Sequence, residues 1–573
     1  MIIELVGLPG AGKSTFARQL SSLGRYTKID IKTTSELLWF NFCFVGYHPV
    51  LFWKLFFLYL RFGLTRGLWY TKLTSVFLDY NAKYAKARRY PYALLDQGHL
   101  QVLMSLFDNQ LPHKDIDSIL RMLPKSDHYI FFDTATDVRK VRLQERGYVS
   151  REGISDAERE QWQQTAENHF VYIKNNVQNL APATIEIITE ESSYDERIQS
   201  YQDAQFMRYI TFGRMPTQKA HGLQIAKMCE AFTQQNVHVS LVTPRRSNDI
   251  QKSVASYYNL QTPLQHYEVP VFDVIGKTKK MTSLHHYLHE FLFALSVFWM
   301  RIPQEIVVYT RTPIIAFVCG LKGNTVVVEQ HDWPTRGSAL HSFFLSSATS
   351  IPCNSEGTHE ACLKHGLEQA FVAHNGFDAS IRTEPIEKSQ ARDNLGLAHD
   401  DFIVMYIGSL GGWKGVDTLA QSAENFEASV KAVVIGGNDT ELQKWKGKYP
   451  QVLFVGPRPY DEIGEHQKAA DVLIVPNNPI SEESRMYTSP IKIFAHMASN
   501  VPMLVSDLPA MRNILSDETA FFFTAGDTES LVTTLQYIKN NPTEAQKRAQ
   551  NAYLQSSEYT WKNRARKIIG YLR

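Results

Sequence analysis

Glycines and a lysine near the N-terminus have the spacing of a loop that binds phosphate. The segment Gly7–Ser14 fits the pattern G-x-x-x-x-G-K-[ST] at every fixed position. In such a loop, backbone N–H groups turn toward the phosphates, and the following helix points its positive end at them. An apolar strand-like segment, 2–7, precedes the loop, and a helical pattern, 14–23, follows it, which is the context that the motif requires. The expected phosphate-binding residues are Gly7, Gly10, Gly12, Lys13, Ser14 and Thr15.

The side chains around this loop have separate expected roles. Lys13 would bridge the β- and γ-phosphates of a nucleoside triphosphate, Ser14 would hold Mg²⁺, and Thr15 would reach the α-phosphate. Asp96 ends the strand-like segment 92–96, where a carboxylate would lie near Mg²⁺ or near an acceptor hydroxyl. We therefore expect ATP and Mg²⁺ as cofactors, with Ser14 and Asp96 at the metal.

The segment 128–147, HYIFFDTATDVRKVRLQERG, resembles the strand and lid helix of nucleoside and nucleotide kinases. Arg142 and Arg146 are four residues apart and so share one helix face. The resemblance implies that these arginines clamp the transferring phosphoryl group, and the alternative is a solvated basic face with Glu145. Asp30 ends the second strand-like segment, where the resemblance implies a catalytic base; the alternative role is a helix cap.

Residues 37–62 are dense in aromatic side chains, but polar or helix-breaking residues interrupt them. The segment lacks the 18 or so unbroken apolar residues of a membrane-spanning helix. Two interpretations stay open: helices buried in the protein, or helices that dock at a bilayer surface through aromatic and basic side chains. The larger insertion, 37–85, lies where the kinase resemblance places the acceptor pocket, which implies an acceptor that is unusual, large or linked to a lipid.

The second half of the chain, 206–573, resembles family 4 glycosyltransferases of the GT-B fold. Segment 213–232 is similar to that family's first strand, loop and helix, in which Gly222 would let the backbone approach the donor phosphate or the acceptor. The segment HNGFD, 374–378, resembles the N-G-x-D step that ends the acceptor domain. His331 is either a functional residue or a buried core histidine. The resemblance places three side chains at the edge of the cleft: Arg311, Glu329 and His331.

The segment YIGSLGGWKGVDTL, 406–419, resembles the family's strand, glycine turn and K-G pair. The resemblance implies that Lys414 neutralises the donor diphosphate as the sugar–phosphate bond breaks. A cation there stabilises charge that grows in the transition state. Gly408 belongs to the turn, and Ser409 takes the place of an arginine found in many relatives, so one cationic contact is expected to be absent.

The segment 487–502, YTSPIKIFAHMASNVP, departs from the family, whose members read S-P-x-K-x-F-E-Y-M-A. Ala495 replaces the glutamate that holds the donor ribose, and Tyr487 stands at the first position of the E-x7-E pair. Losing a buried charge-assisted hydrogen bond costs about 1.5–3 kcal/mol, so we expect weaker or differently organised donor binding, with Glu482 and Glu483 as nearby substitutes. The remaining expected donor-site residues are Arg458, beside the nucleobase with Pro457, and Ser489, Pro490 and Lys492.

Three series of alternating strands and helices must position these groups, which predicts an α/β protein with parallel sheets. The first series is a P-loop kinase-like domain, and the other two are the Rossmann-like domains of a GT-B fold. A polar stretch, 190–205, is predicted to be a last helix and linker, and 291–300 a core helix. The predicted domains are 1–204 (kinase-like), 205–385 (acceptor) and 386–573 (nucleotide-sugar donor).

The amino-acid composition limits which classes of binding partner and which cellular location we expect. The 573 residues include 60 basic and 58 acidic side chains, and this balance predicts no nucleic acid or polyanionic partner. The five cysteines have no metal-like spacing, which is typical of packing residues in a reducing compartment. We expect no signal peptide and a cytoplasmic location, with peripheral contact to the inner face of the membrane through 37–62 as the alternative.

The leading hypothesis is an ATP- and Mg²⁺-dependent kinase fused to a retaining glycosyltransferase that uses a nucleotide sugar and no metal. Both halves would act on a sugar, glycan or glycolipid of one biosynthetic pathway. Two alternatives remain. The second half is a non-catalytic glycan-binding module, as Ser409 and Ala495 suggest, or the first half is a regulatory nucleotide switch.

Overall fold

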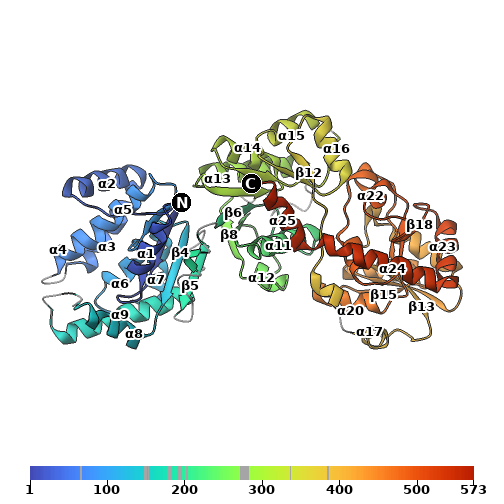
Figure 1. The fold of residues 1–573 in the computed structure, drawn as a ribbon, viewed down its shortest axis with the longest axis horizontal. Helices are drawn as coiled ribbons and strands as arrows, with labels where there is room; N and C mark the ends of the chain where they lie inside the picture. Colours follow the sequence, from blue (N-terminus) through green and yellow to red (C-terminus); the bar gives the residue numbers. More distant parts are fainter. Residues whose placement is uncertain are drawn as a thin grey trace.

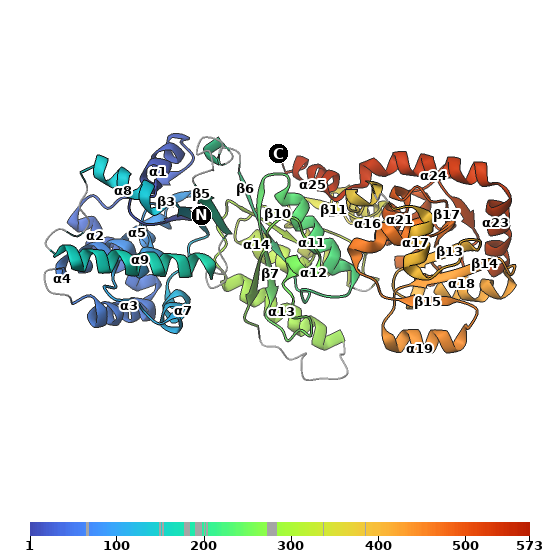
Figure 2. The same cartoon turned by 90° about the horizontal axis from the view of Figure 1, so that it is seen from below.

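A computed structural model gives the fold for residues 1–64, 68–147, 151, 154–176, 184–189, 197–199, 201, 204–271, 283–335, 337–383 and 386–572. Three α/β units follow one another along the long axis of the molecule (Figures 1 and 2). Every paired strand in the described residues runs parallel to its neighbours, as the alternation of strands and helices predicts.

The first unit contains a five-stranded sheet in the order β2-β3-β1-β4-β5. The strand bounds are β1 Ile2–Val6, β2 Thr27–Lys28, β3 Ala93–Leu95, β4 His128–Asp133 and β5 Thr184–Thr189. All five strands were predicted, although β2 ends two residues before Asp30. The connections after β1 and β4 leave to opposite sides, so the loop after β1 lies at the switch point where open parallel sheets bind ligands.

The helices of the first unit lie on both faces of this sheet (Figure 1). Their bounds are α1 Lys13–Ser22, α2 Thr34–Tyr47, α3 Pro49–Phe62, α4 Trp69–Thr71, η1 Lys72–Leu78, α5 Asp79–Ala87, η2 His99–Gln101, α6 Val102–Ser105, α7 His113–Met122, α8 Thr136–Glu145 and α9 Asp156–Asn175. The Thr33 side chain accepts the Glu36 N–H and so caps α2. Proline favours the first turn of a helix because it has no N–H to leave unpaired, and Pro49 starts α3 after a bend of 119°.

The second unit has the sheet order β10-β9-β6-β7-β8, beside a two-stranded ladder of β11 and β12. The strands are β6 Gln205–Ile210, β7 Val237–Pro244, β8 Gln265–Val269, β9 Ile306–Thr310, β10 Val326–Val328, β11 Ile351–Cys353 and β12 Ala370–Val372. The helices are α11 Ala220–Thr233, α12 Val254–Tyr257, α13 Ser283–Trp299, α14 Pro313–Leu321, α15 Ser338–Leu345 and α16 Glu356–Lys364. Strands β8, β11 and β12 were not predicted.

The third unit has a six-stranded sheet in the order β15-β14-β13-β16-β17-β18. Its strands are β13 Phe402–Ile407, β14 Val430–Ile435, β15 Leu453–Gly456, β16 Val472–Val475, β17 Met503–Ser506 and β18 Phe521–Phe523. The helices and turns are η5 Ala379–Thr383, α17 Lys388–Leu395, η6 Gly412–Lys414, α18 Val416–Ser422, η7 Ala423–Asn425, α19 Asp439–Lys448, η8 Tyr460–Glu462, α20 Ile463–Lys468, η9 Glu483–Tyr487, α21 Ile491–Ala498, α22 Pro509–Arg512, α23 Thr528–Asn540, α24 Pro542–Ser556, η10 Ser557–Tyr559 and α25 Trp561–Gly570.

The last helix, α25, departs from the predicted division of the chain. It leaves the third unit after α24 and packs against the second unit, where the C-terminus lies (Figure 1). Trp561, Ala565 and Ile568 share an apolar cluster with side chains of β6, β7 and α11. The donor-side segment 386–573 therefore contributes one helix to the acceptor-side unit.

The first and second units share one apolar core. Phe132 and Tyr201 of the first unit and Phe206 and Val308 of the second belong to the same buried cluster. Two ion pairs also join the units: the Met1 ammonium lies 3.4 Å from Glu305 Oε2, and Arg301 Nη1 lies 3.4 Å from Asp127 Oδ2. The two units are therefore packed against each other rather than joined only through a linker.

The prediction for residues 291–300 needs correction, and the prediction for 190–205 falls largely outside the described residues. The helix over 291–300 is a core helix on one face only: Phe293 and Val297 are buried, but Phe291 and Trp299 are 54% and 78% exposed. The stretch 190–205 lies largely outside the described residues, and its last residue begins β6.

In the described chain no single helix is long and apolar enough to cross a membrane; α2 and α3 meet that criterion only as a bent pair.

Candidate active sites

The loop after β1 has a backbone that only glycine tolerates at two positions. Gly10 and Gly12 have φ values of +82° and +97°, in the left-handed region that favours glycine. A Cβ on Gly10 would also lie 2.7 Å from the Arg139 carbonyl oxygen of α8. Helix α1 has no side-chain cap and no acidic residue in its first turn, so its first N–H groups are available to an anion.

The Lys13 ammonium lies inside this loop. It donates to the carbonyl oxygens of Gly7 at 2.5 Å and Leu8 at 3.0 Å. Burial lowers its pKa to about 8, a shift that Asp96 opposes and Arg139 reinforces. No carboxylate in the described part of the chain forms an ion pair with Lys13, so a phosphate would supply the missing negative charge.

Asp30 and Asp96 meet at one edge of the sheet, around a lysine that the sequence analysis missed. The Lys28 ammonium is 3.1 Å from Asp96 Oδ2 and 3.3 Å from Asp30 Oδ1. Burial alone would lower the pKa of Lys28, but its hydrogen bonds and ion pairs with the two carboxylates outweigh burial and raise it. Asp96 Oδ1 is buried without a hydrogen-bond partner among the described residues, and Ser14 is exposed at the start of α1.

Of the two predicted lid arginines, one reaches the loop. Arg142 Nη1 donates to the Gly10 carbonyl at 3.5 Å, whereas Arg146 is exposed at the end of α8. Arg139 was not predicted; it holds α8 in place by donating to the Thr134 carbonyl at 3.2 Å and to Glu167 at 2.9 Å. No sequence motif marks Arg139.

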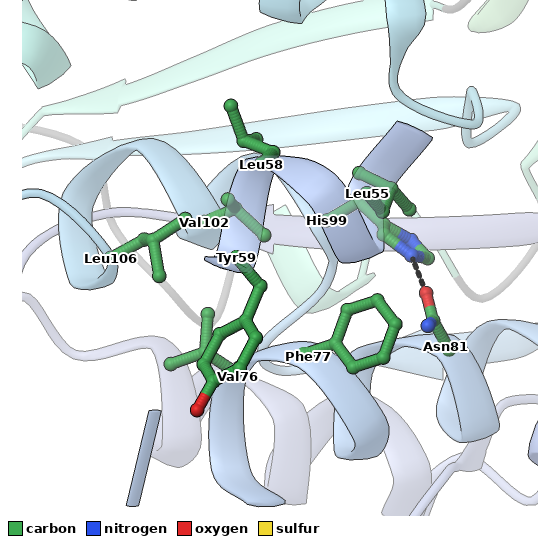
Figure 3. Close-up of a pocket in the computed structure, with 9 residues that line it drawn as sticks. All are labelled: Leu55, Leu58, Tyr59, Val76, Phe77, Asn81, His99, Val102 and Leu106. Atoms are coloured by element: carbon green, nitrogen blue, oxygen red, sulfur yellow. Dashed lines mark hydrogen bonds between the residues drawn. The ribbon is translucent and has the colours of Figure 1, made fainter. Parts of the chain in front are cut away.

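An apolar pocket lies between the insertion at 37–85 and residues 99–106, which follow β3 in the chain (Figure 3). At its polar end, His99 Nε2 and Asn81 Oδ1 are 2.9 Å apart. Burial lowers the pKa of His99 to about 3, so the imidazole is neutral at physiological pH. The pocket is lined by Leu55, Leu58, Tyr59, Val76, Phe77, Asn81, His99, Val102 and Leu106.

In the second unit, the Glu329 carboxylate organises the predicted cleft edge. Its Oε1 lies 2.6 Å from Arg564 Nη2 and 2.7 Å from His331 Nε2, and its Oε2 accepts the Tyr309 hydroxyl at 2.7 Å. Burial would raise the pKa of Glu329, but the charge of Arg564 leads the effects that hold it well below its usual range. The ionised carboxylate is thus fully paired. Sequence reasoning missed Arg564, because it comes from α25, 235 residues away.

His331 is neither isolated nor fully enclosed. Its side chain is 19% exposed, and burial, with the charge of Arg311, lowers its pKa to about 4. A neutral imidazole that donates from Nε2 to Glu329 leaves Nδ1 as an acceptor. This arrangement can accept a hydrogen bond from a sugar hydroxyl at the cleft edge.

Close packing against Tyr258 explains why glycine stands at position 222. A Cβ there would lie 2.2 Å from the Tyr258 hydroxyl. That hydroxyl accepts the Thr217 N–H at 2.9 Å and donates to the Thr217 carbonyl at 2.6 Å. Gly222 therefore makes room for the side chain that fixes the loop before α11, and its approach to a ligand stays a prediction.

Two lysines meet at the carboxyl end of β13. The Lys414 ammonium lies 3.3 Å from the centre of the Trp413 ring, and the Lys492 ammonium lies 4.1 Å from that of Tyr406. Burial lowers the pKa of Lys414 to about 8, opposed by Glu483. Burial and the charge of Lys414 hold the pKa of Lys492 well below its usual range.

The Lys492 ammonium has no hydrogen-bond partner in the described part of the chain. It lies in the first turn of α21, which has neither a side-chain cap nor an acidic residue. A buried cation without a partner is unusual, because burial removes its hydration. The arrangement therefore favours a bound anion between the lysines and the start of α21.

Ser489, Pro490 and Ser409, which were also predicted, lie in the segments next to the lysine pair. Ser489 is bound across the two units: its Oγ accepts the Asn375 N–H at 3.3 Å, and its carbonyl accepts Asn375 Nδ2 at 2.7 Å. Pro490 precedes α21. The Tyr406 hydroxyl donates to the Ser409 carbonyl at 2.7 Å, which fixes the turn that begins at Gly408.

The position that departs from the family pattern is apolar. Ala495 is 4% exposed in a hydrophobic cluster, while Glu482 hydrogen-bonds to Tyr487 and Glu483 acts on Lys414.

Arg458 is exposed after β15. Sequence reasoning missed Asn477, which follows β16 and is fully buried, with no partner among the described residues for either polar side-chain atom.

Comparison with known proteins identifies the region that carries the lysine pair. Residues 401–541 match the family Glycosyl transferases group 1. Over these residues the chain is similar to group 1 glycosyltransferases. Sucrose-phosphate synthase from Thermosynechococcus elongatus superposes with a TM-score of 0.52 at 16% identity, over 64% of this chain and 98% of that protein, a likeness in fold.

Two curated relatives match over limited lengths. D-inositol 3-phosphate glycosyltransferase 1 of Catenulispora acidiphila is 29% identical over 127 residues, which are 19% of this chain and 30% of that protein. D-inositol 3-phosphate glycosyltransferase of Rhodococcus opacus is 23% identical over 202 residues, 32% of this chain and 43% of that protein. The chain spans less than half the length of the curated relatives it matches.

Proposed function

We propose that the protein is a bifunctional enzyme of glycan or glycolipid biosynthesis. In this proposal, the second and third units transfer a sugar from a nucleotide-sugar donor with retention of configuration, and the first unit is an ATP-dependent kinase. The observation that carries the transferase proposal is the lysine pair, Lys414 and Lys492, with the unpartnered Lys492 ammonium beside the start of α21. The match to Glycosyl transferases group 1 supports the same assignment.

The chemistry of the lysine pair fits a nucleoside diphosphate leaving group. Negative charge grows on the diphosphate as the sugar–phosphate bond breaks, and two preorganised cations stabilise that charge more in the transition state than in the ground state. Because the lysines and the N–H groups of α21 balance the charge, this step needs no metal ion. Across the cleft, His331 would accept a hydrogen bond from a sugar hydroxyl while Glu329 fixes its orientation.

Turnover of a panel of nucleotide sugars tests the transferase proposal. We expect Lys414→Ala to lower kcat by about 10²–10³, as the loss of one preorganised group at a developing charge does. Lys431→Ala, which removes an exposed lysine of β14, is the matched control and should retain full activity. Donor binding by the parent protein without turnover would instead favour the non-catalytic glycan-binding module, to which Ala495 points.

Three features of the first unit support the kinase proposal. They are the loop at the switch point of the sheet, the Lys13 ammonium without a contacting carboxylate, and Arg142 against the loop. ATP would bind with its phosphates at the loop. The Ser14 hydroxyl and Asp96 Oδ1 suit Mg²⁺, which prefers oxygen ligands and neutralises phosphate charge; Asp96 Oδ1 has no hydrogen bond among the described residues and lies 3.9 Å from the Lys83 ammonium. Lys28 holds Asp96 and Asp30 at the same edge, where an acceptor hydroxyl would meet Asp30.

The kinase proposal is tested by transfer of labelled γ-phosphate from ATP to glycans and glycolipids of a cell extract. We expect Lys13→Ala to abolish labelling and Lys32→Ala, which removes an exposed lysine near the second strand, to leave it unchanged. Hydrolysis of ATP without any phosphorylated product would contradict the kinase proposal and favour a nucleotide switch.

A further inference from the structure

The outward face of α3 is apolar although nothing in the described protein covers it. Val50, Trp53 and Phe57 are each more than half exposed and recur at helical spacing, so they lie on one face of α3. The opposite face of α3 is already used, because Leu55 and Tyr59 are buried and line the pocket near His99 (Figure 3). Helix α3 therefore carries large apolar side chains on both faces, which is unusual for a helix at a protein surface.

Helix α2, which precedes α3 in the chain, also exposes aromatic side chains. Trp39 and Phe42 are 53% and 71% exposed and stack with their ring centroids 6.0 Å apart. Both views place α2, α3 and α4 at the end of the molecule opposite the third unit (Figures 1 and 2). Soluble proteins rarely expose contiguous apolar patches above a few hundred Å², and larger ones mark sites of interaction.

The charge of the surface indicates what binds it. The sequence has no acidic residue between Glu36 and Asp79. Lys54 and Arg61 are exposed and lie on the same face of α3 as Trp53 and Phe57. Aromatic and basic side chains together are the pattern of a helix that lies in the interface of a membrane, and basic side chains near the surface are attracted to anionic lipids.

We propose that α2 and α3 dock the protein on an anionic lipid bilayer. Trp39, Phe42, Trp53 and Phe57 enter the headgroup region, and Lys54 and Arg61 contact lipid phosphates. A second copy of the chain suits this surface less well. A two-fold symmetric contact pairs the same patch with itself, which would bring Lys54 and Arg61 of both copies together without an acidic partner.

Flotation of the full chain with vesicles tests the proposal. One set of vesicles contains phosphatidylcholine alone, and the other contains phosphatidylcholine with phosphatidylglycerol. We expect binding to the anionic vesicles, and at least tenfold weaker binding for the double variant Trp53→Ser/Phe57→Ser. The matched control is Leu340→Ser/Phe343→Ser, which changes two comparably exposed apolar side chains of α15 in the second unit and should bind like the parent protein.

A second double variant tests the role of charge. Lys54→Ser/Arg61→Ser should bind anionic vesicles about 30-fold less tightly, because each basic residue near an anionic surface contributes about fivefold. Its binding to neutral vesicles should not change. All four substituted side chains on α3 are exposed, so far-UV circular dichroism should match that of the parent protein.

Two results would overturn the proposal. The first is that the parent protein fails to float with anionic vesicles, or that Trp53→Ser/Phe57→Ser floats equally well. The second is that, without vesicles, the parent elutes as a dimer and Trp53→Ser/Phe57→Ser elutes as a monomer. That outcome would assign the surface to a second copy of the chain.

Discussion

At the scale of single residues, the proposed donor site depends on two neighbouring ammonium groups, those of Lys414 and Lys492. Lys414 has Glu483 as an opposing charge, whereas Lys492 is buried over Tyr406 without a hydrogen-bond partner in the described chain. Holding such a group out of water lowers the stability of the protein alone. Functional sites commonly contain titratable groups whose pKa is strongly shifted. The lowered pKa values of Lys414 and Lys492 lead to two predictions.

Binding of a nucleoside diphosphate should weaken as the pH rises above about 8. Lys414 has a pKa lowered to about 8 in the free protein, while a bound diphosphate would keep it protonated. Each further pH unit should therefore weaken binding up to tenfold, because the complex holds a proton that the free protein has lost. Lys414→Arg should reduce this dependence to the part that Lys492 contributes, because arginine stays charged. Titration calorimetry from pH 7 to 9.5 measures both, and equal pH profiles would contradict the assignment.

Lys492→Met should stabilise the protein and weaken its binding of nucleoside diphosphate. Burial and Lys414 lower the pKa of Lys492 well below 10.5, so the protonated side chain destabilises the folded state. Removing it should raise the free energy of unfolding by about 1–4 kcal/mol and weaken binding about tenfold or more. The stability gain is fully present below the lowered pKa and should disappear as the pH approaches 10.5. Urea unfolding at two pH values checks this, and a loss of stability would contradict it.

At the scale of elements, the sequence predicts strands best where an apolar run precedes a polar or glycine-containing turn. Four strands of the first unit carry such a run; β2 was predicted from the segment 26–30, although only Thr27–Lys28 forms the strand. Strands β11, β12 and β18 have three residues each, too few to show a period; β3 and β10 are as short but lie within longer apolar segments. The lysine pair was predicted from two separate motifs, but Lys28, Arg139, Asn477 and the position of α25 depend on contacts between distant segments, which no local pattern carries.

A buried ion pair holds helix α25 to the second unit. Removing this ion pair should lower the stability of the protein strongly. Arg564→Ala leaves the Glu329 carboxylate buried without its arginine, so we expect destabilisation by about 3–5 kcal/mol. Arg566→Ala changes an exposed residue of the same helix and should stay within about 0.5 kcal/mol of the parent protein. Chemical denaturation of both variants gives the comparison, and similar values would show that the pair is unimportant.

At the scale of the whole molecule, the first two units share a core, while the third contributes the group 1 glycosyltransferase match. The proposed kinase is thus packed directly against the acceptor side of the proposed transferase. Cutting the chain between the first two units would expose part of that core to water. Each activity is therefore better tested by substitutions in the full chain than by separated halves.

The shared core predicts that the first and second units unfold together. Phe206→Ala, in the shared cluster, should destabilise both units by about 3–5 kcal/mol. Hydrogen exchange with mass spectrometry should then show faster exchange in β1 and β7 alike. Phe523→Ala, in the core of the third unit, is the control and should affect β13 and β17 only. Faster exchange in β7 without a change in β1 would contradict a shared unit of stability.

We propose that Lys414 and Lys492 together hold the diphosphate of a nucleotide-sugar donor. A double-mutant cycle tests this role by titration calorimetry of UDP, GDP and ADP into the parent protein, Lys414→Ala, Lys492→Met and the double variant, with Lys431→Ala as control. We expect at least one nucleotide to bind the parent and the control equally and each single variant at least tenfold more weakly, with effects that are not additive. Equal binding of that nucleotide by the parent and the double variant would rule out this role for the two lysines.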